Sequence, residues 1–568
     1  MHNLLIDIVT KNIPNDFIGF INRSLYEKIR KEFKKLQLLY SNIDLDTIKD
    51  HFFIYVTSIE NTKYTLEDYE TIIINAIDSI NFKYKYNHES LSFKESILQI
   101  KIFNEEQHKT INFNDVDENK NNELVNSSTF NDFSSALLKN EIILKKDQRL
   151  ESFEKSANKL ARANGCSIIN NKSIINEYAN KFDYPVSVEG SFDEKYLCID
   201  KSILYTVLME NFKVLPMEFE NGNSSNFFVY AKNKNSEDSR VLCAEINNKL
   251  EEINNLITKK SDKKLEDFVE DLKNVTYINN YGNFYDKTQR LIKISHELCK
   301  MLSVSEETVN SVNRISFLCK ADKATEIVKK CSYLHGLIGR LYAKSDGEEK
   351  IVYDGVYEHI KPRFISESIP NSTAARIVAI SDKMEYVMSY IISSSDENFK
   401  YNYKLRKTIT SVISIILKAE LDFNLSDLIT KILYVFLQDK GIVDYEYFEK
   451  SIKEIILDVY RDECIKSGYD FDEIDVINYT NLNIFKLNRL LTNLHEINSK
   501  YNGKLMLQIQ KMLEVNCNEC KYTPMELDSN NLCDMFERLS KCSEEDLAFY
   551  KLIFKGVFNK LNQGECYE

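Results

Sequence analysis

Two histidines and one aspartate in the middle of the chain are residue types that could hold a metal ion. His335 lies in "CSYLHGLIGRLYA", His359 in "EHIKPRF" and Asp382 in "AISDKME". Imidazole and carboxylate ligands suit divalent cations, so a metal-dependent phosphohydrolase is one hypothesis. Helical phosphohydrolases of that kind need an adjacent His-Asp pair, and none of the eight histidines is followed by Asp. We therefore expect no metal ligand here and interpret both histidines as partly buried or solvated.

Two glycines, Gly336 and Gly339, lie about one helical turn apart in the first of these stretches. Glycine lowers the stability of a helix unless something packs closely against it. We therefore predict that both glycines mark a close contact between helices.

Four cysteines near the end of the sequence raise a zinc hypothesis: Cys517 and Cys520 in "CNEC", followed by Cys533 and Cys542. Structural zinc sites commonly pair two C-x-x-C hairpins. Here eight residues separate the second pair. The twelve cysteines of the chain show no regular framework, which is typical of unpaired thiols in a reducing compartment. We expect unpaired cysteines, with zinc at these four positions left open.

The remaining motifs provide no self-sufficient active site. "NGNSSN" (221–226) follows no clear strand and lacks the Lys-Ser/Thr ending of a phosphate loop, so we interpret it as a surface turn. The formal net charge of −13 argues against a protein coated with nucleic-acid-binding cations, although local basic patches are compatible with it. A chain of this size without a catalytic signature is typical of a subunit that positions a substrate for chemistry done elsewhere.

The composition indicates several domains that are mostly helical. A chain of 568 residues is too long for one core, and only 6 prolines and 14 glycines interrupt it. The longest apolar runs are too short to span a membrane. The N-terminus shows neither a basic leader nor a small-residue cleavage site, so we expect a cytoplasmic protein without a membrane partner.

Residue periodicity predicts an α+β beginning and a helical remainder. "LLIDIVT" and "HFFIYVTSI" indicate strands, and 15–41 an amphipathic helix. "SFEKSANKLARANG" predicts a helix that ends at Gly165, and "YPVSVEGSFDEKYL" predicts a turn-rich connector. From about Glu245 onward nearly everything predicts helix, including "LRKTITSVISIILKAEL" with a wide apolar stripe. "SEEDLAFYKLIFKGVFNKL" begins with a capping-box pattern, Ser543 to Asp546.

The order of several motifs resembles the β subunit of the bacterial two-subunit glycyl-tRNA synthetase. "LLIDIVTKNIPNDF", "YPVSVEGSFDEKYL" and "YGNFYDKTQR" are similar to family motifs and stand in the family's order. The stretch from "CKADKATEIV" through "LHGLIGRLYA" to "EHIKPRF" resembles the family's helical HD-like module, and "AISDKME" and "YKLRKTI" follow it. The likeness is colinear from residue 4 to roughly 540.

The resemblance implies a subunit of glycine–tRNA ligase that binds and positions tRNA(Gly) for ATP-dependent glycylation at the active site of an α subunit. It implies an α2β2 assembly, with ATP used at the partner and no catalytic residue in this chain. The cations within the matching motifs are the expected tRNA contacts, although they would equally fit solvated or salt-bridged side chains: Lys287, Arg290, Lys361, Arg363, Arg406 and Lys407.

On the same basis we expect a mainly α, multi-domain chain in six segments. These are an N-terminal α+β domain (1–111), a polar low-complexity insertion (112–142), an α+β accessory domain running into helices (143–300), a helical HD-like domain (301–420), a helical body (421–515) and the truncated start of an anticodon-binding-type helical domain (516–568).

Some positions differ from the family pattern. Two arginines expected in the second strand fall on Phe52 and Phe53, which removes two natural phosphate contacts. The middle region is rich in asparagine, and the chain has no tryptophan. These differences support a second hypothesis, a non-catalytic paralogue that acts as a tRNA- or protein-binding scaffold. A metal-dependent phosphohydrolase using His335, His359 and Asp382 is the third.

Overall fold

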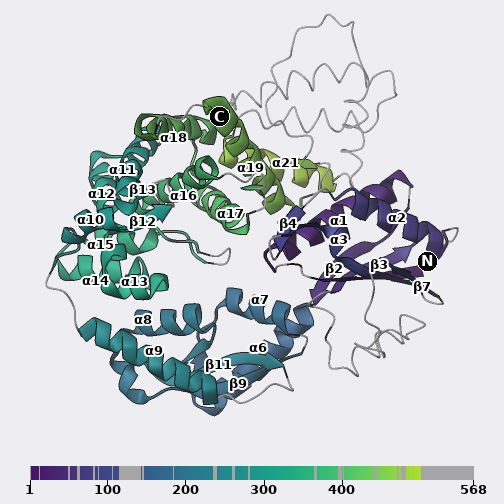
Figure 1. Ribbon diagram of the computed structural model, residues 1–568, viewed down its shortest axis with the longest axis horizontal. Helices are drawn as coiled ribbons and strands as arrows, with labels where there is room; N and C mark the ends of the chain where they lie inside the picture. The colour runs from purple at the N-terminus through teal and green to yellow at the C-terminus, as the bar shows by residue number, and fades with distance from the viewer. Residues whose placement is uncertain are drawn as a thin grey trace, which may run out of the picture. The chain divides into compact units, whose positions relative to one another are not determined.

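The chain forms two compact units, Met1–Lys260 and Ser261–Glu568. The computed structural model describes residues 2–113, 143–258 and 263–500. Within these ranges it leaves out short stretches: 12, 14, 37, 49–50, 61–63, 81–82, 87–88, 105–106, 144–145, 183, 234–239, 279–281, 364–366, 395–398, 401, 441–443, 470–472 and 475–481. Figure 1 shows the elements of each unit.

A five-stranded antiparallel sheet, in the order β2-β3-β1-β6-β7, organises the start of the first unit. Its central strand β1 carries an apolar run, of which Leu4, Ile6 and Ile8 are fully buried. Helices α1 and α2 pack against each other and against the sheet. The elements are β1 (His2–Thr10), α1 (Asn15–Lys35), β2 (Asn42–Ile48), β3 (His51–Ile59), α2 (Leu66–Asp78), β4 (Lys83–Tyr86), β5 (Glu89–Ser92), α3 (Phe93–Ser96), β6 (Ile97–Phe103) and β7 (His108–Asn112).

A second, four-stranded sheet in the order β8-β10-β11-β9 follows in the same unit. Helices α6 and α7 close one core with it, where the rings of Phe153 and Tyr178 lie edge to face, 5.1 Å apart. The elements are α6 (Lys146–Ala163), β8 (Cys166–Ile168), α7 (Lys172–Lys181), β9 (Pro185–Ser191), η1 (Glu194–Cys198), α8 (Lys201–Thr206), η2 (Val207–Asn211), β10 (Leu215–Phe219), β11 (Ser224–Asn233) and α9 (Arg240–Thr258).

The segment predicted as a turn-rich connector is largely a strand. β9 is an edge strand that begins at Pro185, a position where proline's missing N–H does no harm. Gly190 lies opposite Phe228 of β11, and a Cβ atom on Gly190 would stand 2.3 Å from that ring. The glycine therefore leaves room for an aromatic ring and does not mark a turn. "NGNSSN" spans the turn between β10 and β11, so it does follow a strand.

The described part of the second unit is helical apart from the short pair β12 (Thr276–Ile278) and β13 (Gly282–Asn283). Helix α16 runs through its middle and is buried along most of its length (Figure 1). The other elements are α10 (Asp267–Asp271), η3 (Leu272–Asn274), α11 (Phe284–Met301), α12 (Glu306–Leu318), η4 (Ala321–Ala324), α13 (Glu326–Lys330), η5 (Ser332–Leu334), α14 (Leu337–Ser345), α15 (Lys350–Glu358), α16 (Thr373–Ser393), α17 (Tyr403–Lys418), α18 (Leu425–Lys440), α19 (Tyr445–Lys466) and α21 (Ile484–Lys500).

The predicted fold class is confirmed: the chain is mainly α, with α+β structure in its N-terminal part. The two predicted strands are β1 and β3, and the helix predicted to stop at Gly165 is α6, after which that glycine takes φ +63°. The apolar stripe of α17 faces the core as predicted. The division into six segments stays a prediction. The cysteines of "CNEC", Cys533, Cys542, the capping box at Ser543 and most of the low-complexity insertion lie outside the described residues.

Candidate functional site

Two cations of α11 bind one carboxylate of α16 inside the second unit. Lys287 and Arg290 lie about one turn apart on α11, and both reach Glu385. Glu385 Oε1 accepts hydrogen bonds from Arg290 Nε at 3.0 Å and Nη2 at 2.9 Å, and Oε2 accepts one from Lys287 Nζ at 2.7 Å. The hydroxyls of Tyr277 and Ser389 also donate to this carboxylate, each at 2.8 Å. A fully buried carboxylate needs this degree of pairing to remain charged.

Asp382, one turn before Glu385 on α16, joins a second set of cations. Lys320 Nζ donates to Asp382 Oδ2 at 2.7 Å and to His359 Nε2 at 2.9 Å. Lys287 Nζ lies 2.9 Å from Asp382 Oδ1, as an ion pair without hydrogen-bond alignment. Burial by itself raises the pKa of Asp382, but Lys287 and Lys320 outweigh it and hold that pKa well below its ordinary value. Asp382 is therefore a fixed anion between two lysines.

Asp322 in η4 caps the start of α14. Its Oδ2 accepts from the backbone N–H of Gly336 at 2.7 Å and of Gly339 at 3.0 Å, and its Oδ1 accepts from His335 Nδ1 at 2.7 Å. Gly336 is the N-cap of α14 and has no side chain with which to cap it, so a distant carboxylate takes that role. A Cβ atom on Gly339 would stand 2.9 Å from Val356 of α15.

The predicted close contact at the two glycines is confirmed for Gly339, which packs against α15. Gly336 precedes the helix with φ +81°, a left-handed conformation that favours glycine, and it also lies close to the end of α15, where a Cβ atom would stand 3.5 Å from the Tyr357 carbonyl oxygen.

Hydrogen bonds fix both histidines in the same neutral tautomer. His359 Nδ1 lies 2.6 Å from the carbonyl oxygen of Val356 and must donate to it, which leaves Nε2 to accept from Lys320. Burial lowers the pKa of His335 to about 4, although Asp322 acts in the opposite direction. Burial and the charge of Lys320 hold the pKa of His359 well below its ordinary value. Neither imidazole is poised for general base catalysis near neutral pH.

The predicted exposure of the histidines is wrong for His359, which is fully buried, while the His335 side chain is 12% exposed. The structure does bring His335, His359 and Asp382 together, with the two rings 5.3 Å apart. However, the ammonium of Lys320 lies between His359 and Asp382 and supplies the positive charge that a metal ion would supply. Among the described residues, no three His, Cys, Asp or Glu side chains are placed to hold a metal ion.

Lys287 and Arg290, expected as tRNA contacts, lie in the interior, with 4% and 2% of their side chains exposed. Their charges face Glu385 and Asp382, whereas a phosphate contact needs a cation at the surface. In this structure they stabilise the packing of α11 on α16, and the packing does not present them to a nucleic acid.

The other expected cations gather where α15 ends and α17 begins. Ser411 of α17 donates to the carbonyl oxygens of Pro362 and Lys407, both at 3.0 Å, which brings the segment after α15 next to the first turns of α17. Lys361 and Arg363 flank that proline, with side chains 16% and 28% exposed. Lys361 Nζ lies 3.6 Å from a Glu358 oxygen, beyond hydrogen-bond distance.

Besides Lys361, two of these cations have acidic neighbours. Arg363 binds Glu367, with Nη2 3.1 Å from Oε1. Arg406 binds Asp458 at 2.6 Å and also Asp462, both on α19. The alternative of a salt-bridged cation therefore applies to both Arg363 and Arg406, and Arg406 also links α17 to α19. Lys361, Arg363 and Lys407 form what we call the basic junction.

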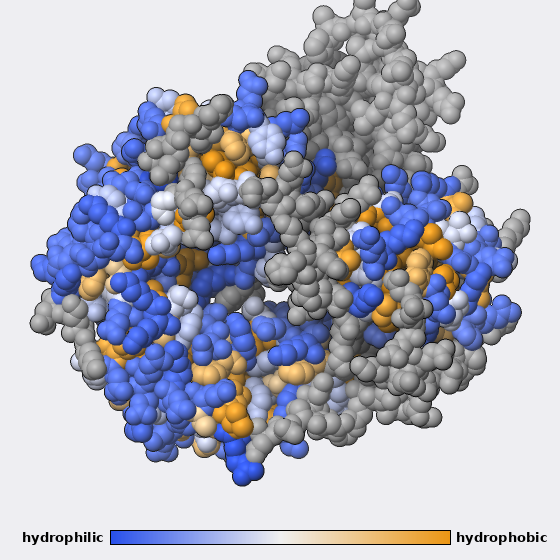
Figure 2. All heavy atoms as spheres, in the orientation of Figure 1, coloured by the Kyte–Doolittle hydropathy of each residue, from blue (hydrophilic) through white to orange (hydrophobic). Residues whose placement is uncertain are grey.

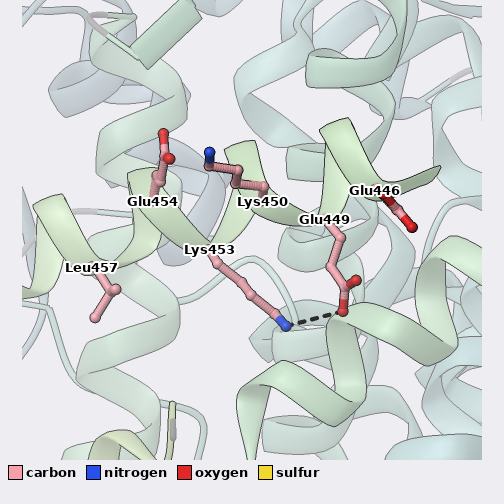
Figure 3. A pocket seen from close by; sticks show the side chains of 6 residues that line it. All are labelled: Glu446, Glu449, Lys450, Lys453, Glu454 and Leu457. Atoms are coloured by element: carbon pink, nitrogen blue, oxygen red, sulfur yellow. Dashed lines mark ion pairs between the residues drawn. The ribbon is translucent and has the colours of Figure 1, made fainter. Parts of the chain in front are cut away.

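Two other surface features of the described residues are a hydrophilic face and a pocket. Figure 2 shows a largely hydrophilic face over α10, α12, α14 and α15. The pocket in Figure 3 is lined by one face of α19, where Lys453 and Glu449 pair at 3.0 Å. Side chains of both charges alternate there and none converges on a common point, so the pocket indicates no ligand chemistry.

Sequence reasoning missed the residues that hold the network together: Lys320, Asp322, Lys383 and Glu385. All four lie in stretches that resemble family motifs, but the resemblance assigned them no structural role. A signal was present, because Lys287 and Arg290 on one helix match the spacing of Asp382 and Glu385 on another. Opposite charges at helical spacing on two segments indicate helices that pack through buried ion pairs.

The comparisons with known proteins agree on one family. The family model described as "Glycyl-tRNA synthetase beta subunit" matches residues 44–478. A glycine–tRNA ligase beta subunit from Syntrophus aciditrophicus is 28% identical over 341 residues, 59% of this chain and 49% of that protein. The one from Dictyoglomus thermophilum is 24% identical over 445 residues, 75% of this chain and 62% of that protein. This chain thus spans roughly half to three-fifths of the length of these curated relatives.

None of the described helices is both long and apolar enough to cross a lipid bilayer. The family match is continuous and includes every residue of the buried network as well as the basic junction. The chain belongs to the glycyl-tRNA synthetase beta subunit family, within the aminoacyl-tRNA synthetases.

Proposed function

We propose that this chain binds tRNA(Gly) and an α subunit, and positions the tRNA for ATP-dependent glycylation at the active site of that partner. In this proposal the chain holds no ATP and no catalytic residue of its own. It holds the acceptor end within reach of the α subunit, which makes the transfer step effectively intramolecular. The assembly is of the α2β2 type and works in the cytoplasm.

The observation that carries the proposal is the family match over residues 44–478. The charge distribution supports a role in positioning. Most charges of the buried network pair with one another between packed helices, and both histidines are held neutral. Within the basic junction, Lys361 and Arg363 are more exposed than the buried Lys287. Phosphate contacts by such side chains fix the register of an RNA without reading its sequence.

A tRNA-binding titration at about 50 and about 200 mM salt tests the contact. Wild type should lose affinity steeply with salt, because each phosphate contact releases counterions. Lys361→Gln and Lys407→Gln should each reduce the slope of log affinity against log salt by about 1. Lys344→Gln, an exposed lysine on α14, is the matched control and should leave the slope unchanged.

Glycylation is tested by expressing the full chain with a cognate α subunit. The expected result is a stable complex that charges tRNA(Gly) faster than the α subunit alone. Absence of a complex together with no gain in charging would reject the proposal. Binding of tRNA without any gain in charging would favour the second candidate, a non-catalytic tRNA-binding scaffold, which the buried Phe52 and Phe53 support.

A further inference from the structure

Lys383 is a buried lysine whose ammonium group donates hydrogen bonds to three backbone carbonyl oxygens. It lies on α16 between Asp382 and Glu385, and only 8% of the residue is exposed. Its Nζ donates to the carbonyl oxygens of His359 at 3.2 Å, Ile360 at 3.3 Å and Lys361 at 2.8 Å. The three donors of one ammonium thus meet three consecutive carbonyls.

These carbonyls directly follow the end of α15 at Glu358. The last carbonyls of α15 already have partners: those of Gly355, Tyr357 and Glu358 accept from backbone N–H groups of the segment that follows, and that of Val356 from His359 Nδ1. Lys383 binds the next three carbonyls, just beyond the negative end of the helix dipole, where a positive charge is favourable. Lys383 therefore fixes the path of the chain immediately before Pro362 and Arg363.

A second anchor holds the same segment from the other side. Ser411 of α17 donates to the Pro362 carbonyl oxygen at 3.0 Å. The segment that carries Lys361 and Arg363 is thus tied to α16 through Lys383 and to α17 through Ser411. Of these two anchors, only Lys383 can change its charge.

We propose that Lys383 is a positioning residue for RNA binding: its buried ammonium holds residues 359–363 in the shape that presents Lys361 and Arg363 to phosphates. This inference rests on the proposed function, because it assumes that the basic junction contacts RNA.

The protonation of Lys383 makes the proposal testable. Burial lowers its pKa to about 8; the nearby cations Lys320 and Lys287 act in the same direction, while Asp382 and Glu367 oppose them. Above this pH the amine is neutral and has one donor fewer, so the carbonyl segment is released. Ordinary surface lysines and arginines keep their charge in this range.

Global unfolding would not explain a loss of binding at alkaline pH. The folded-state pKa of Lys383 lies below the ordinary 10.5. Between these two values the unfolded chain binds more protons than the folded one, so this residue raises the free energy of unfolding as pH increases. RNA affinity and stability should therefore move in opposite directions.

The experiment measures tRNA affinity of the full chain at about pH 7 and about pH 9. The affinity of the wild type for tRNA should fall roughly tenfold at the higher pH, because the released segment no longer presents Lys361 and Arg363 to phosphates. Lys383→Arg keeps its charge and should bind equally at both pH values, whereas Lys383→Met should bind weakly at both. Lys323→Met is the control, because burial also lowers the pKa of Lys323 to about 8; it should keep the wild-type pH response.

Wild-type affinity that is equal at both pH values would overturn the inference, as would a folded Lys383→Met variant that binds like wild type. The wild-type pH profile decides the question even where a variant does not fold. Loss of binding in Lys361→Gln beside an unaffected Lys383→Met would leave the proposed function intact and reject this inference alone. No tRNA binding by wild type at any pH would reject both.

Discussion

Arg290 and Glu385 meet through two hydrogen bonds of 3.0 and 2.9 Å between helices α11 and α16. The side chains are 2% and 0% exposed, so water screens neither charge. The pair belongs to the buried network that contains Lys287, Lys320 and Asp382. Such a network does not tolerate the loss of one member, because the remaining charges stay buried without a partner.

Glu385→Gln should destabilise the second unit by about 3–5 kcal/mol, since Lys287 and Arg290 then lose their shared anion. Urea denaturation measures the loss. The control is Glu454→Gln, which removes a surface pair with Lys400 at 3.9 Å, about half exposed on both sides, and should change stability by less than about 1 kcal/mol. Equal effects of the two variants would contradict a special role for the network.

Asp322→Asn should lower stability by about 2–3 kcal/mol, because one carboxylate oxygen accepts from two backbone N–H groups and the other from His335. An amide keeps the size of the side chain but not both acceptors. Hydrogen exchange at the first turn of α14 reports the effect locally. Unchanged protection at Gly339 would show that the cap does not depend on the charge.

Gly339→Ala should destabilise the protein by about 1–3 kcal/mol through overpacking. The new Cβ atom would stand 2.9 Å from Val356 and 3.2 Å from the Asp322 carboxylate. Helix propensity alone predicts the opposite sign, a gain of about 1 kcal/mol. Thermal melts compared with Lys344→Ala, an exposed position on the same helix, separate the two effects. Any stabilisation by Gly339→Ala would refute the close contact with α15.

Acid should destabilise the second unit through its neutral histidines. The folded-state pKa of His335, about 4, lies below the ordinary 6.5, so between these values the unfolded chain binds more protons than the folded one. The free energy of unfolding therefore decreases as the pH is lowered. We expect a loss of about 2 kcal/mol from this residue between about pH 7 and about pH 5. Denaturant titrations at both pH values measure it.

His335→Gln should reduce this pH dependence and leave the contribution of His359, whereas His296→Gln, at an exposed position on α11, should preserve the full dependence. A variant at His335 with the full wild-type slope would show that the pH dependence comes from other groups.

In the first unit, Gly190→Ala should destabilise by about 1–3 kcal/mol, because the added Cβ atom would push the fully buried Phe228 ring out of its place. Ser187→Ala on the same strand adds no atom and therefore creates no clash, so it serves as the comparison. Its loss of stability should be limited to the hydrogen bonds of Ser187 with Ser156 and Phe153. A ring that moves without a change in the melting temperature would contradict the prediction.

The sequence predicts the helices well where the pattern is local. The stripe of α17 and the strand β3 follow from spacing alone, because each buries one regular set of side chains. The sequence of β9 suggests turns, because it contains Pro185 and Gly190. Only the pairing with β11 shows that Pro185 begins an edge strand and that Gly190 leaves room for the Phe228 ring. Such cross-strand information has no counterpart in a local pattern.

The candidate site was harder to predict for the same reason. Lys287 and Arg290 read as surface cations because charged residues are usually exposed. Their burial depends on Glu385, nearly a hundred residues later in the chain. Lys361 and Arg363 could be proposed from the sequence, but the lysine that holds their backbone could not, since Lys383 lies on another helix, more than twenty residues later in the chain.

Asp322 has a consequence for the order in which the helical unit forms. Helix α14 has nine residues and begins at a glycine, so as a separate segment it lacks both the length and the side-chain cap to persist in water. Its cap arrives from fourteen residues upstream, when η4 packs. Nucleation of this helix is therefore a tertiary event, and the "CSYLHGLIGRLYA" stretch should gain its structure cooperatively with the surrounding module.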